Sequence, residues 1–557
     1  MNTRARAPEN QTPPLENVDL FAYDRPLVEA LAQAAPAMQT VELSEIGHLA
    51  SEPQWIQAGF DANERPPELH AYDRTGARID EVRFDPAWHA LVRVAVERGL
   101  HAAPWRDLAP SAHLRRAAKF YLWSQNEAGH GCPISMTYAA VPALRHAPAI
   151  AARWEPALAS RVYDPRLIPI EQKAGALCGM GMTEKQGGSD VRATQTRAVR
   201  TRAFGGDGEY LVTGDKWFCS APMCDAFLVL ARAEGGLSCF LMPRVLPDGT
   251  RNAFAILRLK DKLGNRSNAS SEVEFDGAYA RLVGQEGLGV QTILEMVNHT
   301  RLDCITGSAA LLRAAFAQAA HHAVHRKTFG KYLAEHALMQ NVLADLALES
   351  EAATRTFVRV GQAVDDSWTD ASAAALRRIG TAVGKYWVCK RAPAATAEAL
   401  ESLGGNGYVE ESAMPRLYRE APVNSIWEGS GNINALDVLR VLAKQPEAFE
   451  AMRAEIAPAA SADARIAASL NVLEGELRDP AERDARRIVE RLALTWQAAL
   501  MRRDAPGEIA DAFVASRIAG DWGHAFGTLP RWVDAAGVMA RAWPPLENAR
   551  PRVAGRA

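Results

Sequence analysis

The spacing of hydrophobic positions changes twice along the chain. Between residues 24 and 165, apolar side chains recur every three or four positions, which predicts amphipathic helices. Residues 171–285 hold short apolar runs between turn residues, for example 226–231, which predicts short strands. From Leu288 the helical spacing returns, and a final helical stretch rich in alanine and arginine covers about 445–543. The pattern therefore predicts a small β module between helical regions.

This order of elements sets the expected fold class. Helices and strands occupy separate segments instead of alternating, which is typical of α+β proteins and argues against βαβ units. With 557 residues, the chain is long enough for three or four domains. We expect a loose N-terminal arm, a helical domain, a central β domain, a helical bundle and an extra helical domain. Their expected bounds are 1–20, 21–178, 179–285, 286–440 and 441–557.

The composition argues against several classes of protein. The net charge of −3 gives no overall attraction to nucleic acids or anionic membranes. The seven cysteines, with no CxxC pair, favour neither a disulfide framework nor a metal site, and they fit a reducing compartment. The sequence has no 18-residue apolar run and no apolar stretch near its N-terminus, so we expect no membrane span or secretion signal. These features predict a cytoplasmic protein without a bound metal.

Two segments of the β region carry candidate ligand-binding residues. The first, 182–190, has glycines that let the backbone approach a ligand and hydroxyl groups that can donate hydrogen bonds. The second, 212–220, ends an apolar strand with two aromatic side chains that can stack on a flat cofactor. A turn leading into a strand and a core tryptophan are the alternative explanations. The candidates are Met182, Thr183, Gly188 and Ser189 in the first segment, and Trp217, Phe218, Cys219 and Ser220 in the second.

Two later segments contain groups that can bind phosphates. Arg326, three residues before Phe329, can grip a pyrophosphate through two parallel hydrogen bonds. The same segment would also serve as an ordinary helix end, because glycine follows Phe329. Gly404 and Gly405 can present backbone N–H groups to a phosphate or to an adenosine moiety.

Glu428 is the candidate catalytic carboxylate. It follows Trp427 and precedes a Gly-Ser-Gly turn, so an apolar neighbour and a flexible turn could tune and aim it. Taken alone, a glutamate beside a glycine is more often an ordinary loop charge.

Taken together, these segments resemble the acyl-CoA dehydrogenase superfamily in their order and spacing. The closer resemblance is to the AidB-like flavoproteins of the adaptive response to DNA alkylation. It is carried by MTEKQGGSDV (182–191), RLKDKLGNRSNAS (258–270), PRLYRE (415–420) and PVNSIWEGSGNI (422–433). Lys185 and Glu401 depart from the usual superfamily residues, and the AidB-like branch shares both departures.

The resemblance implies a fold, a cofactor and residue roles. The fold would be an N-terminal helical domain, a central β-barrel, a C-terminal four-helix bundle and an extra helical domain. Glu428 would be the base that takes the α proton of an acyl-CoA, with Arg301 close by. The subunits would form a homotetramer, a dimer of dimers. FAD would be held by the β-region candidates named above, by Ser430 and Asn432, and, across a subunit interface, by Arg326, Phe329, Gly404 and Gly405.

The AidB-like branch also implies binding of double-stranded DNA through the extra C-terminal domain. Residues 441–557 carry 16 basic and 16 acidic side chains, so any attraction to phosphates would come from a local arginine stripe. Interleaved acidic residues also allow a solvated, salt-bridged helix. The candidate DNA contacts are Arg440, Arg483, Arg486, Arg487, Arg491, Arg502 and Arg503.

Two functions follow as hypotheses. The first is a DNA-associated flavoprotein of the alkylation response with weak acyl-CoA dehydrogenase activity, similar to that on isovaleryl-CoA. The second is an ordinary acyl-CoA dehydrogenase of fatty-acid or branched-chain catabolism with a structural tail. A nitroalkane-type oxidase on the same fold is less favoured, because by resemblance such enzymes carry Asp at the position of Glu428.

Overall fold

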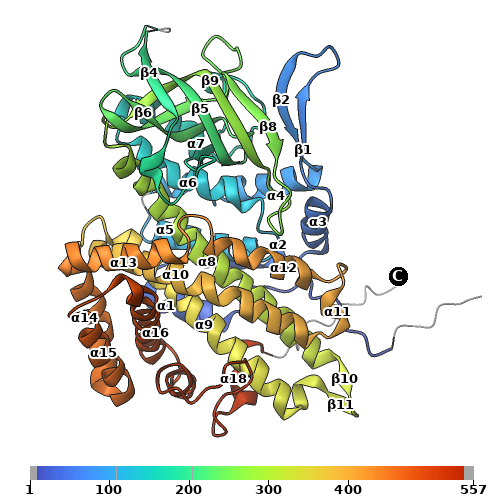
Figure 1. Ribbon diagram of the computed structural model, residues 1–557. Helices are drawn as coiled ribbons and strands as arrows, with labels where there is room; N and C mark the ends of the chain where they lie inside the picture. The colour runs from blue at the N-terminus through green and yellow to red at the C-terminus, as the bar shows by residue number, and fades with distance from the viewer. Residues whose placement is uncertain (1–8, 108, 203–204, 545–557) are drawn as a thin grey trace, which may run out of the picture. The chain divides into compact units, whose positions relative to one another are not determined.

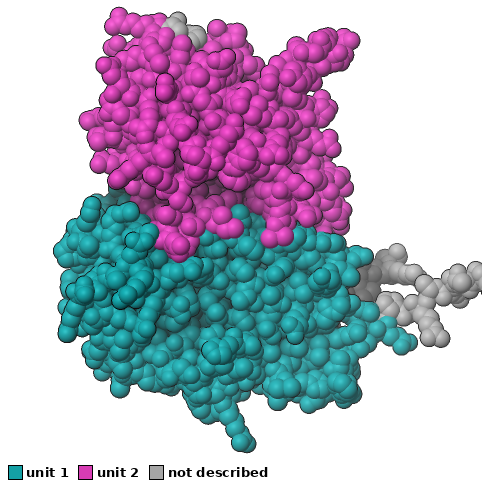
Figure 2. All heavy atoms as spheres, in the orientation of Figure 1, with its two compact units in different colours: residues 1–54, 305–425, 434–557 teal, residues 55–304, 426–433 magenta. Residues whose placement is uncertain are grey.

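The computed structural model describes residues 9–107, 109–202 and 205–544, and the chain divides into two compact units (Figure 2). The barrel unit comprises residues 55–304 and 426–433. The helical unit comprises residues 1–54, 305–425 and 434–557. Glu428 therefore belongs to the barrel unit, although the segments on both sides of 426–433 belong to the helical unit.

The N-terminal part of the barrel unit is helical, as the spacing predicts, but it also contains a hairpin. Strands β1 (Glu68–Tyr72) and β2 (Arg78–Arg83) pair antiparallel. Asp73 closes the turn by accepting hydrogen bonds from the backbone N–H groups of Thr75 and Ala77. The region is otherwise helical, as expected, and the Asp-x-x-Gly sequence of the turn signals the hairpin. The helices are α3 (Pro53–Glu64), α4 (Pro86–Glu97), α5 (Ala112–Ser124), α6 (Gly131–Leu144) and α7 (Pro148–Leu158), with short helices η1 (Ala103–Trp105) and η2 (Ile170–Gln172).

The predicted central β domain is confirmed as a seven-stranded sheet (Figure 1). The strands pair in the order β3-β6-β4-β5-β9-β7, and β8 pairs with β9. A further pairing between β6 and β7 joins the sheet to itself, so the strands form a barrel. The strands are β3 (Cys178–Gly181), β4 (Arg197–Thr201), β5 (Glu209–Ser220), β6 (Ala226–Ala233), β7 (Gly236–Pro243), β8 (Phe254–Leu259) and β9 (Ser270–Val283), with a short helix η3 (Val191–Ala193) before β4.

Aromatic side chains pack in the barrel core. The rings of Phe227 and Phe254 stack with centroids 5.1 Å apart, and Phe254 lies 5.4 Å from Phe275. Residues 226–231 of β6 are fully buried, which explains why this strand reads as a continuous apolar run instead of an alternation.

The helical unit is built from long helices, as the second helical region of the sequence predicts. Helix α9 packs against α10, α1 and α18, and α10 packs against α14 and α16. Helices α8 (Gly289–His325) and α13 (Gly431–Lys444) have residues in both units. The others are α1 (Arg25–Ala34), α2 (Val41–Ala50), α9 (Ala337–Asp366), α10 (Ala371–Ser402), α11 (Gly405–Tyr408), α12 (Ala413–Glu420), α14 (Pro446–Ala462), α15 (Ala464–Glu476), α16 (Ala485–Asp504), α17 (Gly507–Phe513) and α18 (Ala535–Ala542). Short elements are β10 (Lys327–Thr328), β11 (Lys331–Tyr332), η4 (Leu333–Glu335), η5 (Ala421–Ser425), η6 (Glu482–Asp484) and η7 (Val514–Ile518).

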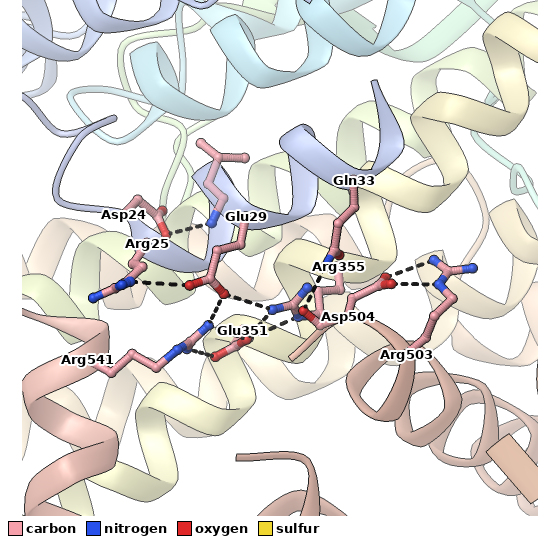
Figure 3. Close-up of polar contacts among 10 residues, drawn as sticks. Asp24, Arg25, Glu29, Gln33, Glu351, Arg355, Arg503, Asp504 and Arg541 are labelled. Atoms are coloured by element: carbon pink, nitrogen blue, oxygen red, sulfur yellow. Dashed lines mark hydrogen bonds and ion pairs between the residues drawn. The ribbon is translucent and has the colours of Figure 1, made fainter. Parts of the chain in front are cut away.

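Buried ion pairs join α1, α9 and α18 (Figure 3). Arg541 donates to Glu351 Oε2 and to Glu29 Oε2, each at 2.5 Å, and Arg355 donates to Glu351 Oε1 at 2.6 Å. A polar cavity of about 340 Å³ lies beside this cluster and is lined in part by Arg355, Arg359 and Arg503. Glu455 accepts both hydrogen bonds of the Arg359 fork at 2.9 Å, so the charges around the cavity pair within the protein.

A buried carboxylate on α9 accepts several of the hydrogen bonds that fasten the residues beyond α16. Asp345 is fully buried and accepts hydrogen bonds from the Arg517 guanidinium, from Trp522 Nε1 at 2.9 Å and from the Gly527 backbone N–H at 2.9 Å. Arg517 also pairs with Glu349. Because no water reaches this carboxylate, its donors come from the protein, which ties the irregular segment after α17 to the bundle.

The expected N-terminal arm is ordered where the structure describes it. Residues 1–8 of this arm lie outside the described residues. Asn10 Oδ1 accepts from the Lys327 backbone N–H at 2.7 Å, and the Asn10 backbone oxygen accepts from Arg326 Nη1 at 2.6 Å. Thr12 Oγ1 lies 2.8 Å from His322 Nδ1. The described part of the arm is therefore bound to the helical unit and is not loose.

The seven cysteines are all free and buried. Six of them, Cys132, Cys178, Cys219, Cys224, Cys239 and Cys304, belong to the barrel unit, and Cys389 belongs to the helical unit. Among the described residues, no helix is both long and apolar enough to cross a bilayer.

Candidate active site

Glu428 lies in the turn between η5 and α13 and has a left-handed backbone conformation. Its φ is 57°, and that of the following Gly429 is 98°. A glutamate in this region is uncommon, and such strained positions cluster at functional sites. The strain is a first sign that this glutamate is more than an ordinary loop charge.

Two consecutive residues of α8 hold Glu428. The Thr300 hydroxyl donates to Glu428 Oε2 at 2.7 Å, and Arg301 Nε donates to the Glu428 backbone oxygen at 2.9 Å. Arg301 is only 5% exposed, so the alternative of a helix-surface salt bridge is excluded. The structure thus places Arg301 next to the candidate base, where it holds the turn through the backbone.

The Thr183 loop is held by a buried ion pair beneath it. Glu184 Oε1 accepts from Lys216 Nζ at 2.7 Å and from Thr196 Oγ1 at 2.6 Å, and its other oxygen accepts from the Gln195 backbone N–H. Burial opposes ionisation of this carboxyl, but the hydrogen bonds and the Lys216 charge outweigh burial and lower the pKa of Glu184 to about 2. Glu184 is therefore an ionised anchor for the loop.

The loop also brings Thr183 to the end of β5. The Trp217 backbone N–H donates to the Thr183 backbone oxygen at 2.8 Å. A Cβ atom added at Gly188 would lie 2.3 Å from Thr183 Oγ1, so only glycine leaves this threonine its place. Of the other candidates in this loop, Met182 is half-buried and Ser189 is exposed.

A bulge at the end of β5 sets the direction of the aromatic pair. The register with β9 shifts between Lys216 and Cys219, which is the signature of a β-bulge. Phe218 is 51% exposed, and Lys260 Nζ lies 3.4 Å from the centre of the Trp217 ring, so a cation covers one face of that ring. The Cys219 side chain is fully buried in the barrel, so contact between its thiol and a bound cofactor is excluded.

Cys132, at the start of α6, is a buried thiol near the end of β5. Its thiol hydrogen-bonds with Ser220 and Asn268 and feels the charge of Glu428. Burial above all, with a contribution from Glu428, raises the pKa of Cys132 to about 12, so the group is a neutral thiol. Ser220 at the strand end therefore lies beside this thiol, and the negative charge of Glu428 acts on it.

The remaining candidates for cofactor contact divide between the two units. Ser430 is half-buried and Asn432 is exposed in the barrel unit, close in sequence to Glu428. Phe329 in the helical unit is 99% exposed with a φ of 49°, at the tip of the β10–β11 hairpin. In the same unit, Gly404 and Gly405 have open space where a side chain would stand.

The candidate DNA-binding arginines differ in their surroundings. Arg483, Arg487 and Arg440 have side chains 88%, 70% and 62% exposed. Arg502 is 22% exposed and pairs with Asp463 and Asp511. The other arginines also have partners within the protein: Arg491 pairs with Glu476, Arg503 with Asp504, and Arg486 hydrogen-bonds Tyr386.

Three family models match consecutive parts of the chain. The models are described as the adaptive response protein AidB N-terminal domain (residues 10–165), the acyl-CoA dehydrogenase middle domain (179–278) and the acyl-CoA dehydrogenase C-terminal domain (287–443). The AidB protein of Escherichia coli K12 is 46% identical over 90% of this chain and 93% of its own. The chain belongs to the acyl-CoA dehydrogenase family. Within this family it is AidB-like, and it is an FAD-dependent oxidoreductase of the acyl-CoA dehydrogenase type.

Solved structures of similar proteins support this assignment. The apo form of Bd2924 is 29% identical and matches 89% of this chain and all of its own with a TM-score of 0.80. Caenorhabditis elegans ACDH-11, solved in complex with C11-CoA, is 25% identical and matches 93% of this chain and 94% of its own, also with a TM-score of 0.80. These proteins share the helical and barrel architecture seen here.

The residues present fit FAD. The glycine at position 188 keeps the Thr183 hydroxyl in place, Ser220 stands at the strand end, and Phe218 is exposed beside them. The sequence predicts these residues and Glu428 as candidates, and the structure adds Thr300 and Cys132. Thr300 directly precedes the predicted Arg301, which was a usable signal, whereas nothing in the sequence around Cys132 indicates that its thiol meets Ser220.

Proposed function

We propose that this protein dehydrogenates an acyl-CoA thioester between its α and β carbons, with Glu428 as the base. The observation that carries the proposal is the setting of Glu428. Its carboxylate is held by Thr300, its backbone is held by Arg301, and its charge acts on Cys132, the thiol that Ser220 also bonds. The acyl-CoA substrate class is supported by the complex of ACDH-11 with C11-CoA.

The chemistry explains why a positioned carboxylate is needed. An α C–H bond is a weak acid, so a base must remove the proton while the thioester oxygen is polarised by hydrogen-bond donors. Glu428 takes that proton, and Arg301 keeps the turn in the strained conformation that aims the carboxylate. When bound, FAD supplies the acceptor for the β hydrogen, which leaves as a hydride.

We also propose which residues hold the cofactor. Thr183 and Ser220 would bond the polar edge of the flavin ring, with Trp217 and Phe218 packed beside it. A second copy of the chain would add Arg326, Phe329, Gly404 and Gly405 from its helical unit, within a homotetramer. In this role, the exposed ring of Phe329 would contact the cofactor bound to the neighbouring subunit.

The flavin itself provides the test. Purified protein should show the absorbance of bound FAD, and anaerobic addition of a short acyl-CoA such as isovaleryl-CoA should bleach it. Glu428→Gln should keep the FAD and abolish the bleaching, because the amide accepts no proton. The matched control is Glu274→Gln, which changes a half-exposed glutamate on β9 and should bleach like the wild type. A colourless protein, or unchanged bleaching by Glu428→Gln, contradicts the proposal.

The proposal extends to binding of duplex DNA through the C-terminal domain, as expected for an AidB-like protein in the alkylation response. The exposed side chains of Arg440, Arg483 and Arg487 support it, because such groups can replace counterions on phosphates. The half-buried, doubly paired Arg502 is less suited, since a phosphate would have to displace its carboxylates. We therefore narrow the DNA contacts to the three exposed arginines.

Duplex binding measured at several salt concentrations tests this extension. Replacing Arg440, Arg483 and Arg487 with alanine should weaken binding and lower the salt slope by about 1 for each lost contact. The control replaces Arg25, Arg166 and Arg200, also exposed, and changes the net charge equally. Equal effects of the two sets, or no binding, would favour the alternative: an ordinary metabolic acyl-CoA dehydrogenase with a structural tail. Both alternatives place the protein in the cytoplasm.

A further inference from the structure

The polar cavity of about 340 Å³ in the helical unit is lined by residues of α1, α9 and α16. Three of these residues are arginines, Arg355 and Arg359 on α9 and Arg503 on α16. Among the described residues that line the cavity, Asp504 is the only carboxylate. The wall of the cavity therefore carries more positive than negative charge.

The three arginines use the same edge of the guanidinium for their ion pairs. Each donates from Nε and Nη2 to a neighbouring carboxylate, at distances between 2.6 and 3.0 Å. The pairs are Arg355 with Glu351, Arg359 with Glu455, and Arg503 with Asp504, and the first and third are drawn in Figure 3. The third nitrogen, Nη1, takes no part in these strong pairs.

The Nη1 groups have long hydrogen bonds or none. Arg359 Nη1 lies 3.4 Å from Gln362 Oε1, and Arg503 Nη1 lies 3.4 Å from Glu455 Oε2. Both distances exceed that of an ordinary N–H···O bond, about 2.9 Å. Among the residues that the structure describes, Arg355 Nη1 has no hydrogen-bond partner, although this side chain is only 1% exposed. Because a buried donor without an acceptor is costly, we expect a bound group to accept from it.

We propose that this cavity binds a phosphate group, either as free phosphate or as part of a small phosphomonoester. A phosphomonoester has three outward oxygens, one for each Nη1, whereas a carboxylate has only two. Its charge of nearly −2 at neutral pH complements the positive wall. The existing ion pairs can remain, because they use the other edge of each arginine.

Size and location also support a separate site. Ligand sites range upward from roughly 300 Å³, so a cavity of about 340 Å³ suits a small phosphorylated molecule. None of its lining residues has a role in the proposed binding of FAD, acyl-CoA or DNA. The inference therefore stands or falls independently of the proposed function.

The experiment titrates FAD-loaded, full-length protein by calorimetry at neutral pH and constant ionic strength. Inorganic phosphate and glycerol 3-phosphate should each bind saturably, and acetate and glycerol should bind more weakly or not at all. Tighter binding of glycerol 3-phosphate than of phosphate would identify a phosphomonoester as the ligand, and the reverse would identify free phosphate. Absence of saturable binding of both overturns the proposal.

Two variants locate the binding. Arg503→Gln should raise the dissociation constant about tenfold, because the phosphate loses one charge-assisted hydrogen bond. Arg355→Lys keeps the positive charge beside Glu351 but has no Nη1, and it should weaken binding by at least about tenfold. If Arg355→Lys does not fold, Arg503→Gln decides the question, because its side chain is 49% exposed and the fold tolerates its change.

The matched control is Arg453→Gln. The Arg453 side chain is 47% exposed and pairs with Glu450, so its replacement removes the same charge from a similar setting outside the cavity. It should bind phosphate like the wild type, while thermal unfolding without phosphate and FAD content report the fold of every variant. Equal weakening by Arg503→Gln and Arg453→Gln, or unchanged binding in Arg503→Gln, would show that phosphate does not bind in this cavity.

Discussion

Two glutamates of the barrel unit are held in unfavourable settings by specific hydrogen bonds and charges: Glu428 in a strained backbone conformation and Glu184 in a buried position. Glu428 keeps a left-handed backbone because Arg301 binds its carbonyl oxygen and Thr300 binds its side chain. Glu184, only a short way along the chain from Thr183, is buried and ionised because Lys216 and two residues before β4 satisfy its oxygens. Removal of a single partner therefore leaves a buried charge without compensation.

The ionised state of Glu184 predicts a pH dependence of stability. Its folded pKa of about 2 lies below the ordinary value of 4.5, so its stabilising effect is complete above about pH 4.5 and is lost as the pH falls through about 2. In Glu184→Gln we expect a loss of roughly 2–3 kcal/mol at neutral pH. Urea unfolding of both proteins from pH 7 to pH 3 should show this difference shrinking as the pH falls.

A nearby surface pair serves as the control for Glu184. Lys185 lies 3.7 Å from Glu274, and both side chains are about half exposed. Lys185→Ala should change stability by less than about 0.5 kcal/mol, because water screens exposed pairs. A constant difference between the wild type and Glu184→Gln over the whole pH range would show that this carboxyl is not the group that titrates.

At the scale of elements, Asp345 accepts three of the hydrogen bonds that tie the segment after α17 to α9. Asp345→Ala removes the acceptor for Arg517, for Trp522 and for the Gly527 backbone, and leaves Arg517 buried. We expect a loss of about 3 kcal/mol in the free energy of unfolding and faster hydrogen exchange across 517–529. Hydrogen exchange followed by mass spectrometry measures both the size and the location of the effect.

The comparison for Asp345 uses an exposed acceptor. Arg453 donates to Glu450 at 3.0 Å on the surface of α14, and Glu450→Ala should leave exchange at 517–529 unchanged. Protection of this segment in Asp345→Ala equal to that of the wild type would mean that its other contacts, such as those of Asn341 with Leu529 and of Glu349 with Arg517, are enough to hold it.

Periodicity alone located the long helices and most strands correctly. The expected runs 226–231 and 237–242 lie within β6 and β7, and the helix expected from Leu288 is α8. The β1–β2 hairpin escaped because its strands are short and half exposed, so they lack a strong apolar alternation. The bulge that turns Trp217 and Phe218 depends on pairing with β9, which no local pattern records.

The sequence indicated some residues of the candidate site and not others, for a related physical reason. Residues with unusual chemistry for their position, such as Glu428 beside its glycines, could be found from the sequence. Thr300 and Cys132 are ordinary buried residues in helices, and they matter only because folding brings Thr300 to Glu428 and Cys132 to Ser220. The arginine stripe is a different case. The sequence allowed either DNA contacts or salt bridges within the protein, and in the structure Arg491 and Arg502 have acidic partners.

For the whole molecule, the exposed tip of the β10–β11 hairpin predicts dependence on assembly. Phe329→Asn keeps the left-handed turn, because asparagine tolerates positive φ, but removes the exposed aromatic ring. We expect weaker FAD retention and a smaller particle by light scattering, with little change in unfolding of the isolated chain. If this variant still forms an FAD-loaded tetramer, Phe329 does not have the proposed role at the subunit interface.

The control for this prediction is another exposed aromatic residue. Trp532 is 57% exposed and belongs to the C-terminal part of the helical unit. Trp532→Ala should leave the mass of the particle and its FAD content as in the wild type.

Labelling of the buried cysteines can measure when each part of the protein unfolds. A thiol in the interior reacts with an alkylating reagent only after the structure around it opens. Because six thiols belong to one unit and Cys389 alone to the other, the number of labels gained at each moment distinguishes which unit opens first. Mass shifts on the intact chain would thus report the order of unfolding without any added dye.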